Sequence, residues 1–369
     1  MPKIKKTATE ITISNIFKKV LVLQGGGALG AYQLGVYKAI HEKKLDLDWV
    51  IGTSIGAING GIIAGNPPER RLQKLQEFWS IVQNQSIQSL EDNKSLFNLL
   101  TMTYGIKGFF TPTFLNWFDA NKKVGIENAS YYSTKALKDT LGQLIDLDYL
   151  NSKKVRLSVG AVSALTGEMR YFDSAKEVLT LEHIMASSAL PPAFPAVKIN
   201  GEPFWDGGIY SNTPIEAVLE DYPRDNSLIF SVQLWNPLSK EPSSIQEVLI
   251  KKKDIQFASR DRQLDNVKKT HRLRHILRRL TDHIPEAQKK LPEVQELMSW
   301  GCDTVMHIIY LTIDRIEGES QMKDIDFTSE GILKRSATGF REATRAIESQ
   351  VWNEPHDVNE GILIHDQFR

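Results

Sequence analysis

Ser54 is the residue of this sequence that is best placed to act as a nucleophile. It lies in Gly52-Thr53-Ser54-Ile55-Gly56, which fits the pattern G-x-S-x-G. The apolar run 49–51 precedes the pattern and a helix of small residues, 57–64, follows it, so a sharp turn from strand to helix is predicted. Only small neighbours such as Gly52 and Gly56 fit in such a turn, and its strained backbone lifts the serine hydroxyl out of the packing. The helix N-terminus also favours negative charge there.

A serine hydroxyl is a weak nucleophile until a base accepts its proton, and Asp206 is the candidate that we favour. It follows Phe204-Trp205 and precedes Gly207-Gly208, so the chain can turn tightly and another residue can approach the carboxylate. An Asp-Gly turn without a catalytic role is the alternative interpretation. None of the eight histidines follows a predicted strand in the way Asp206 does, but His356 or His365 in the tail would complete the chain order Ser, Asp, His.

A glycine-rich turn, Gly25-Gly26-Gly27-Ala28-Leu29-Gly30, could supply backbone amides. It joins an apolar run, 20–23, to a segment with helical apolar spacing, 28–43, which again predicts a strand, a turn and a helix. Because glycine has no Cβ, the N–H groups in such a turn can point at a ligand. If they point at a reacting carbonyl, Gly25, Gly26 and Gly27 form an oxyanion hole.

The same turn also fits G-x-G-x-x-G, the pattern of a dinucleotide-binding site. An acidic residue lies at about the right distance, at Asp46 or Asp48. The ribose-binding acid, however, belongs at the carboxyl end of the second strand, where this chain has Gly52-Thr53-Ser54 instead. We therefore favour the oxyanion hole and keep the dinucleotide site as an alternative.

These turns need strands to position them. Two successive strand–turn–helix units, 20–43 and 49–64, predict parallel strands joined by right-handed crossovers. A hairpin is predicted around Thr166-Gly167, and further strands are predicted at 228–234 and 305–313. We expect an α/β fold with a three-layer core, a mostly parallel central sheet and appended C-terminal helices.

The chain divides by pattern into three regions: a tail at 1–17, a core at 18–240 and a C-terminal extension at 241–369 that packs on the core. Within the core, residues 80–150 are rich in aromatic side chains and form either irregular core filling or a lid over a site. In the extension we expect a basic helix at 244–280, a strand at 305–313 and a terminal helix at 327–352.

The basic helix has two interpretations. From Lys251 to Arg279 it holds eleven Lys and Arg residues against three Asp, with an apolar stripe that includes Leu273 and Ile276. The stripe either packs on the core or makes residues 251–279 a surface that contacts an anionic membrane peripherally, or a partner.

Composition limits the possible partners. The 369 residues include 45 Lys and Arg and 45 Asp and Glu, so net charge attracts neither nucleic acid nor a membrane. The single Cys302 excludes an intramolecular disulfide and a thiolate-rich metal site. We read no signal peptide at the N-terminus and expect a cytoplasmic protein, with the inner membrane surface as the site of any peripheral contact. The oligomeric state is not indicated.

Four blocks, in this order, resemble those of the patatin-like phospholipase family. They are GGGALG at 25–30, GTSIGA at 52–57, ASSALPPAFP at 186–195 and DGGI at 206–209. The resemblance covers nearly the whole chain. The chain is similar to a bacterial branch of the family that carries a C-terminal extension of unassigned function.

The resemblance implies a serine acyl hydrolase that cleaves lipid or lipid-like carboxylic esters through an acyl-enzyme. Ser54 would be the nucleophile and Asp206 its base, without histidine, and Gly25, Gly26 and Gly27 would supply the oxyanion N–H groups. No metal and no cofactor are implied. The chain departs from the family at Leu29, where a Lys or Arg is common, so the resemblance does not imply a substrate that carries phosphate.

Overall fold

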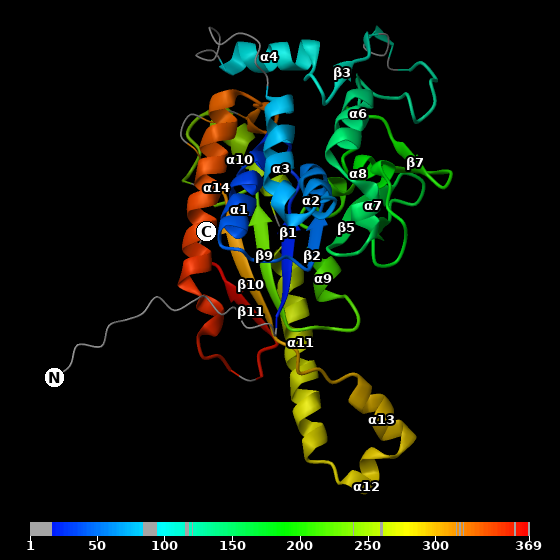
Figure 1. Cartoon of the computed structure of the whole chain (residues 1–369), viewed down its shortest axis with the longest axis vertical. Helices are drawn as coiled ribbons and strands as arrows, with labels where there is room; N and C mark the ends of the chain where they lie inside the picture. The colour runs from blue at the N-terminus through cyan, green and yellow to red at the C-terminus, as the bar shows by residue number, and fades with distance from the viewer. Residues whose placement is uncertain are drawn as a thin grey trace, which may run out of the picture.

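The computed structural model describes residues 17–83, 94–114, 118–119, 121–238, 240–258, 261–314, 316, 319, 321–357 and 359–367. Of the tail expected at 1–17, only Phe17 is among them. Within these residues the chain forms a nine-stranded sheet in the order β11-β10-β9-β1-β2-β5-β8-β7, with β6 also paired to β5. Figure 1 shows helices over both faces of this sheet.

The centre of the sheet is parallel. β1 (Lys18–Leu23) lies between β2 (Trp49–Gly52) and β9 (Ser227–Gln233), and all three run in the same direction. Because their side chains alternate between the two faces, each strand contributes to two apolar clusters. Leu21 and Leu23 pack on one face with α1 (Ala31–Glu42) and α2 (Ile55–Ala64); Val20 and Val22 pack on the other with α9 (Glu216–Leu219). The expected three-layer α/β core with a mostly parallel sheet is confirmed.

The antiparallel strands lie at one end of the sheet. β5 (Arg156–Ser163) is parallel to β2, and it forms the predicted hairpin with β6 (Met169–Asp173), where Gly167 takes a φ of +74°. β8 (Glu202–Asp206) runs antiparallel to β5, and β7 (Val197–Ile199) pairs with β8. Helix α8 (Leu181–Ser187) connects the hairpin to these strands.

The C-terminal extension continues the sheet of the core. β10 (Met306–Thr312) pairs in parallel with β9, and β11 (Ile362–His365) pairs with β10. Helix α14 (Ser329–Ser349) packs along α1, where a Cβ on Gly35 would lie 1.9 Å from the Ser336 carbonyl oxygen. A strand and a long helix therefore lie where the sequence predicts them, and the short 3-10 helix η5 (Val351–Asn353) follows the long one.

The prediction of one basic helix over 244–280 was wrong, because the chain forms two helices there. α10 (Ile245–Phe257) begins with the Ser244 side chain accepting a hydrogen bond from Glu247 N–H at 3.2 Å, and α11 (Asp261–Asp282) follows. Ala258 is extended, with φ −60° and ψ 154°. The Phe257 carbonyl is bound by side chains of the core and its ring lies 5.0 Å from that of Trp235, which fixes the end of α10.

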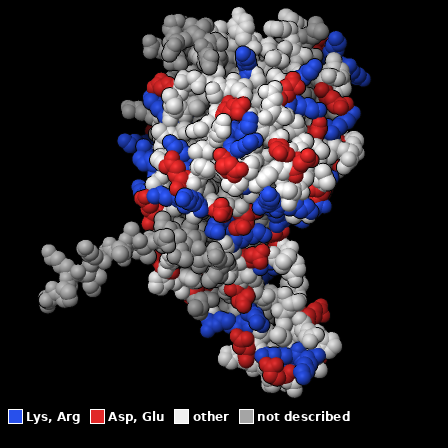
Figure 2. Space-filling model, in the orientation of Figure 1, with Lys and Arg blue, Asp and Glu red and all other residues white. Residues whose placement is uncertain are grey.

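Helix α11 packs on the body of the molecule through Val267, His271 and His275. Its end extends from the body and forms an arm with α12 (Glu286–Lys289) and α13 (Pro292–Ser299), at the lower end of Figure 1. Figure 2 shows Lys and Arg mixed with Asp and Glu over the face in view, with no large area of one sign. None of the helices in the described part of the chain combines the length and apolar character that crossing a bilayer requires.

The aromatic segment 80–150 is partly core and partly surface. It includes the end of α3 (Pro68–Val82), and then α4 (Lys94–Tyr104), β3 (Thr111–Pro112), β4 (Tyr132–Ser133), α6 (Lys135–Leu144) and α7 (Leu147–Asn151). Phe109, Phe110 and Tyr132 are buried with their rings against Phe194. Tyr104, Phe114 and Phe118 are exposed, and Trp117 lies outside the described residues.

Candidate active site

Ser54 occupies a strained turn between β2 and α2. Its φ of 57° and ψ of −126° are conformations that residues other than glycine rarely adopt. The two glycines of the pattern are required by close backbone contacts. A Cβ on Gly52 would lie 2.2 Å from the Gly56 carbonyl oxygen, and one on Gly56 would lie 2.2 Å from that of Leu23. The turn therefore has the sharp geometry that G-x-S-x-G predicts.

Two further serines hold this turn in place. The Ser54 N–H donates to the Ser187 carbonyl at 3.0 Å and to the Ser187 hydroxyl at 3.2 Å. The Ser187 hydroxyl itself donates to the Gly160 carbonyl at 2.6 Å, and the Ser188 hydroxyl donates to the Ser54 carbonyl at 3.3 Å. The sequence interpretation gave these serines no role, although they lie in the block at 186–195.

Asp206 ends β8 and is only 1% exposed. Burial raises the pKa of its carboxyl to about 7, while hydrogen bonds from the Ser54 side chain and from Gly208 N–H, the latter 2.7 Å long, oppose the shift. The structure thus brings the side chains of Ser54 and Asp206 together. Gly207 permits this, because a Cβ there would lie 2.4 Å from the Gly160 carbonyl oxygen.

The glycine turn lies beside Ser54. A Cβ on Gly25 would be 3.0 Å from the Ser54 Cβ. The Gly25 N–H, however, donates to the Asn212 carbonyl at 3.1 Å, so it is not available to an oxyanion. Within the described residues, no backbone carbonyl accepts a hydrogen bond from Gly26 or Gly27, which precede and begin the short helix η1 (Gly27–Gly30). Gly27 has a φ of +55°.

Side chains distant in sequence fix the Gly25 carbonyl. Trp235 Nε1 donates to it at 2.8 Å and Asn212 Nδ2 donates to it at 3.1 Å. Gln24 lies beneath the turn, where its side-chain oxygen accepts from the N–H groups of Leu234 and Trp235 and its amide nitrogen donates to Thr213 at 2.6 Å. Sequence reasoning missed these residues, because their spacing of about 190 to 210 positions carries no local signal.

The geometry does not support a dinucleotide site. Asp46 and Asp48 are exposed, and Asp48 precedes β2, where its side chain accepts a hydrogen bond from Lys19 N–H at 2.8 Å. The carboxyl end of β2 carries Ser54 instead of an acid.

The geometry does not support a histidine base either. The His365 ring lies on β11 and stacks on His307, with 5.3 Å between ring centroids, and His356 packs against His307 at 5.5 Å. β11 is four strand positions from β2, which at about 4.8 Å per strand is about 19 Å. Both candidate histidines are therefore far from Ser54.

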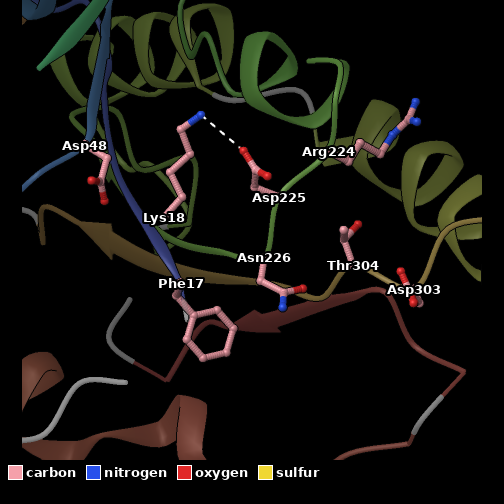
Figure 3. A pocket seen from close by; sticks show the side chains of 8 residues that line it. All are labelled: Phe17, Lys18, Asp48, Arg224, Asp225, Asn226, Asp303 and Thr304. Carbon is pink, nitrogen blue, oxygen red and sulfur yellow. Dashed lines mark hydrogen bonds and ion pairs between the residues drawn. The ribbon is translucent and has the colours of Figure 1, made fainter. Parts of the chain in front are cut away.

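A cavity of about 570 Å³ lies at the opposite edge of the sheet (Figure 3). It is lined by residues that precede β1, β9 and β10, and by Lys18, whose Nζ lies 3.5 Å from an Asp225 carboxylate oxygen. Ser54 follows the carboxyl end of β2, whereas this cavity is at the amino ends, so it is separate from the candidate active site.

Exposed apolar side chains lie in the segments next to Asp206. Leu190, Ile209 and Tyr210, which are neighbours of the Asp206 turn, are exposed, and Leu29 is buried. In the described part of the chain, no three His, Cys, Asp or Glu residues are grouped as metal ligands.

Two family models match this chain, the first in the core and the second in the C-terminal extension. The model of the patatin-like phospholipases matches residues 21–219, and a second model, described as patatin phospholipase, matches residues 255–359. The first match covers both turns, Ser54 and Asp206.

The individual relatives match this chain either over a short segment or at low identity. A putative patatin-like phospholipase domain-containing protein of Caenorhabditis elegans, M110.7, is 42% identical over 60 residues, which is 16% of this chain and 6% of that protein. Lysophospholipase NTE1 of Eremothecium gossypii is 26% identical over 255 residues, which is 60% of this chain and 14% of that protein. This chain thus spans a small part of these relatives. The crystal structure of VipD from Legionella pneumophila aligns with 96% of this chain and 72% of its own, at a TM-score of 0.42 and 14% identity.

The fold and the paired turns define an α/β protein with a serine nucleophile motif. The chain belongs to the patatin-like phospholipase family, whose members are hydrolases that act on lipid esters.

Proposed function

We propose that the protein is a serine acyl hydrolase that cleaves lipid or lipid-like carboxylic esters through a Ser54–Asp206 dyad. One observation carries the proposal: Ser54 sits in a strained turn with its side chain hydrogen-bonded to a buried carboxyl group whose pKa is about 7. A carboxylate with an ordinary pKa of about 4 is a feeble base toward a hydroxyl, and desolvation makes it a stronger one.

In the first half of the reaction, the Ser54 hydroxyl oxygen attacks the ester carbonyl while its proton moves to Asp206. The N–H groups of Gly26 and Gly27 stabilise the tetrahedral oxyanion, and Gly25 is withdrawn from this role because its N–H is bound to Asn212. Asp206 then gives the proton to the leaving alkoxide, and the acyl group remains on Ser54.

In the second half, Asp206 accepts a proton from water, which attacks the acyl-enzyme. Collapse of the second tetrahedral intermediate releases the carboxylic acid and returns the proton to Ser54. The same base thus serves both steps, and no cofactor is used.

The substrate class follows from the surface of the site. Leu190, Ile209 and Tyr210 offer apolar area beside Asp206, which suits an acyl chain. Leu29 places no charge near the glycine turn, so acyl-chain contacts rather than phosphate contacts are expected to dominate binding. We propose lipid esters as substrates on this ground, with the headgroup left open.

We also propose that the protein is cytoplasmic and that the basic segment 251–279 contacts the inner membrane surface. Lys269, Arg272, Leu273 and Ile276 lie on one exposed face of α11, at helical spacings of three and four, and Leu280 extends it. Basic residues interleaved with exposed leucines suit an anionic lipid surface. The opposite face of this stretch packs on the body of the molecule, where His271 and His275 are buried.

Kinetics of single variants test the dyad. Ser54→Ala and Asp206→Asn are each expected to lower kcat on an acyl-p-nitrophenol ester by about 10³-fold or more, because nucleophile and base act as a unit. Ser152→Ala and Asp148→Asn change exposed residues in the same way and serve as controls with wild-type turnover. Near-normal turnover in both dyad variants would overturn the proposal.

A further inference from the structure

We propose that the C-terminal extension is a working part of the active site, with the Asp254–Lys323 ion pair acting as a pair of positioning residues for the glycine turn. The inference rests on the proposed function of that turn as an oxyanion hole. It gives a role to the extension, whose β10, β11 and α14 otherwise only complete the core.

The end of α10 bonds directly to the residues that hold the turn. The Phe257 carbonyl accepts from Asn212 Nδ2 at 2.9 Å and from Gln24 Nε2 at 3.2 Å. The same Asn212 nitrogen donates to the Gly25 carbonyl at 3.1 Å, so Gly25 and Phe257 share one donor. A shift of Phe257 would therefore be transmitted to Gly25 through a single side chain.

Asp254 and Lys323 fix the position of this helix end. Lys323 Nζ lies 2.6 Å from Asp254 Oδ1, and the two residues are only 6% and 4% exposed, respectively. Lys323 Nζ also lies 5.2 Å from the ring of Trp235, the residue whose Nε1 bonds the Gly25 carbonyl. A buried charge without its partner is strongly unfavourable, so each group constrains the position of the other.

A second contact reaches the turn from the other side. Lys323 begins η4 (Lys323–Ile325), and a Cβ on Gly27 would lie 2.3 Å from the Asp324 carbonyl oxygen. The Asp324 carboxylate accepts from Lys253 Nζ, which is 2.5 Å away. The backbone at Gly27, with its φ of +55°, is therefore packed directly against the extension.

These contacts enclose the two amides that the mechanism uses. Gly25 is fixed on one side by Asn212 and Trp235 of the core, which Phe257 and Lys323 of the extension contact in turn. Gly27 is packed directly against Asp324 of the extension on the other side, so Gly26 and Gly27 lie between an indirect and a direct support. Oxyanion donors must sit at about 2.7–3.1 Å from the developing charge, and loss of one costs about 10²–10³ in kcat. Small displacements of this turn should therefore affect kcat more than substrate binding.

The test compares Lys323→Met and Asp254→Asn with a control that breaks a partly buried ion pair elsewhere. Asp221→Asn removes a partner of Arg156, which also binds Asp173 and lies near the amino end of β5, away from the glycine turn. All three variants should lose stability in urea. Only Lys323→Met and Asp254→Asn should lower kcat of the full chain, by about tenfold or more, with KM changed by less than about twofold.

Hydrogen exchange provides a readout that does not depend on activity. Backbone amides of residues 24–30 should exchange faster in Lys323→Met and Asp254→Asn than in wild type, and should be unchanged in Asp221→Asn. Lys253→Met breaks a half-exposed pair with Asp324 and is expected to fold. It should also lower kcat and speed the exchange of the amides at 24–30.

Unchanged exchange at 24–30, or kcat within twofold of wild type in the variants that fold, would overturn the inference. If wild type and Ser54→Ala hydrolyse esters equally, the proposed function fails, and the exchange measurement still decides whether the extension holds the turn.

Discussion

The carboxyl group of Asp206 is buried at the end of β8 and accepts hydrogen bonds from the Ser54 side chain and from Gly208 N–H. Burial raises its pKa to about 7 because a charge is poorly solvated there, and the two hydrogen bonds offset only part of this effect. A base with such a pKa is half-ionised near neutral pH and matches the needs of proton transfer from a serine hydroxyl.

This pKa predicts the pH dependence of hydrolysis. Asp206 must be ionised to accept the Ser54 proton, so kcat/KM should rise with pH, with an apparent pKa of about 7, and reach a plateau above pH 8. The measurement is a pH–rate profile on an acyl-p-nitrophenol ester between pH 5 and pH 9. A profile that is already flat above about pH 5.5 would mean that the base has the pKa of an ordinary carboxylate.

The same shift predicts a pH-dependent gain in stability for Asp206→Asn. Between about pH 4 and about pH 7 the folded chain keeps a proton that the unfolded chain has released, so the free energy of unfolding of wild type falls as the pH rises. Asparagine carries no charge, and the variant should be more stable than wild type at pH 8, by up to about 4 kcal/mol. Urea denaturation at pH 5 and pH 8 measures this.

Asp148→Asn, at an exposed position, is the control for that comparison and should show no such dependence. An Asp206→Asn variant that is equally destabilised at both pH values would contradict the account of the carboxyl environment.

For single residues, the sequence was informative where residues adjacent in the chain determine the backbone geometry of a turn. Gly52 and Gly56 flank Ser54, and Gly207 follows Asp206, so the need for small neighbours could be inferred locally. Asn212, Ser187 and Trp235 could not be inferred, because their roles are hydrogen bonds to backbone groups more than 130 positions away.

Among the elements, the packing of α1 on α14 joins the core to the extension. The backbones approach so closely that a Cβ on Gly35 would meet the Ser336 carbonyl and one on Gly339 would lie 2.2 Å from the Tyr32 carbonyl oxygen. The Tyr32 hydroxyl also donates to Glu342 at 2.5 Å. The interface therefore depends on glycines on both helices.

Gly35→Ala should destabilise the protein, because its methyl group would lie 1.9 Å from backbone atoms that cannot move independently. The expected loss in free energy of unfolding is about 1–3 kcal/mol, the usual cost of overpacking. Gly142→Ala in α6 is the matched control. Its Cβ would be 3.6 Å from Leu181, so it should be neutral or stabilising by up to about 1 kcal/mol. Equal stability of Gly35→Ala and wild type in urea would contradict the close approach.

The sequence predicted most of the parallel strands and the helices α1, α2 and α14, because continuous apolar runs and helical spacing are local signals. It did not predict α3, which has 15 residues. It failed at 244–280, where capping at Ser244 and a continuous helical pattern favour one helix. Contacts of Phe257 with Trp235 and Asn212 override that pattern and end α10 early. Such tertiary contacts leave no trace in local periodicity.

For the whole molecule, the candidate active site and the outer part of α11 are separate, although Asp254 and Phe257 at the start of the basic segment contact the residues that hold the glycine turn. Ser54 lies where β2 ends, and α11 extends from the body beyond the opposite edge of the sheet (Figure 1). The sequence predicted the basic character of 251–279 but not the position of these residues in the fold. The direction in which α11 crosses the sheet is set by tertiary packing, which leaves no local signal. Contact of the arm with a membrane should therefore affect localisation more than chemistry.

Reversal of charge on the arm tests this separation. Lys269→Glu with Arg272→Glu should weaken sedimentation with vesicles that contain anionic phospholipid by about tenfold or more, at about 1 kcal/mol for each basic residue. Turnover of a water-soluble ester should be unchanged. Lys153→Glu with Lys154→Glu, an equal charge change on the core, is the control. Vesicle binding that survives the arm variant would contradict a membrane role for this face.

The central claim, that Ser54 is the nucleophile and Asp206 activates it, is tested most directly by a fluorophosphonate and mass spectrometry of the labelled protein. We expect one adduct, on the peptide that contains Ser54, formed at neutral pH in wild type and at least about 100-fold more slowly in Asp206→Asn. An adduct on another residue, or equal labelling of Asp206→Asn and wild type, would contradict it.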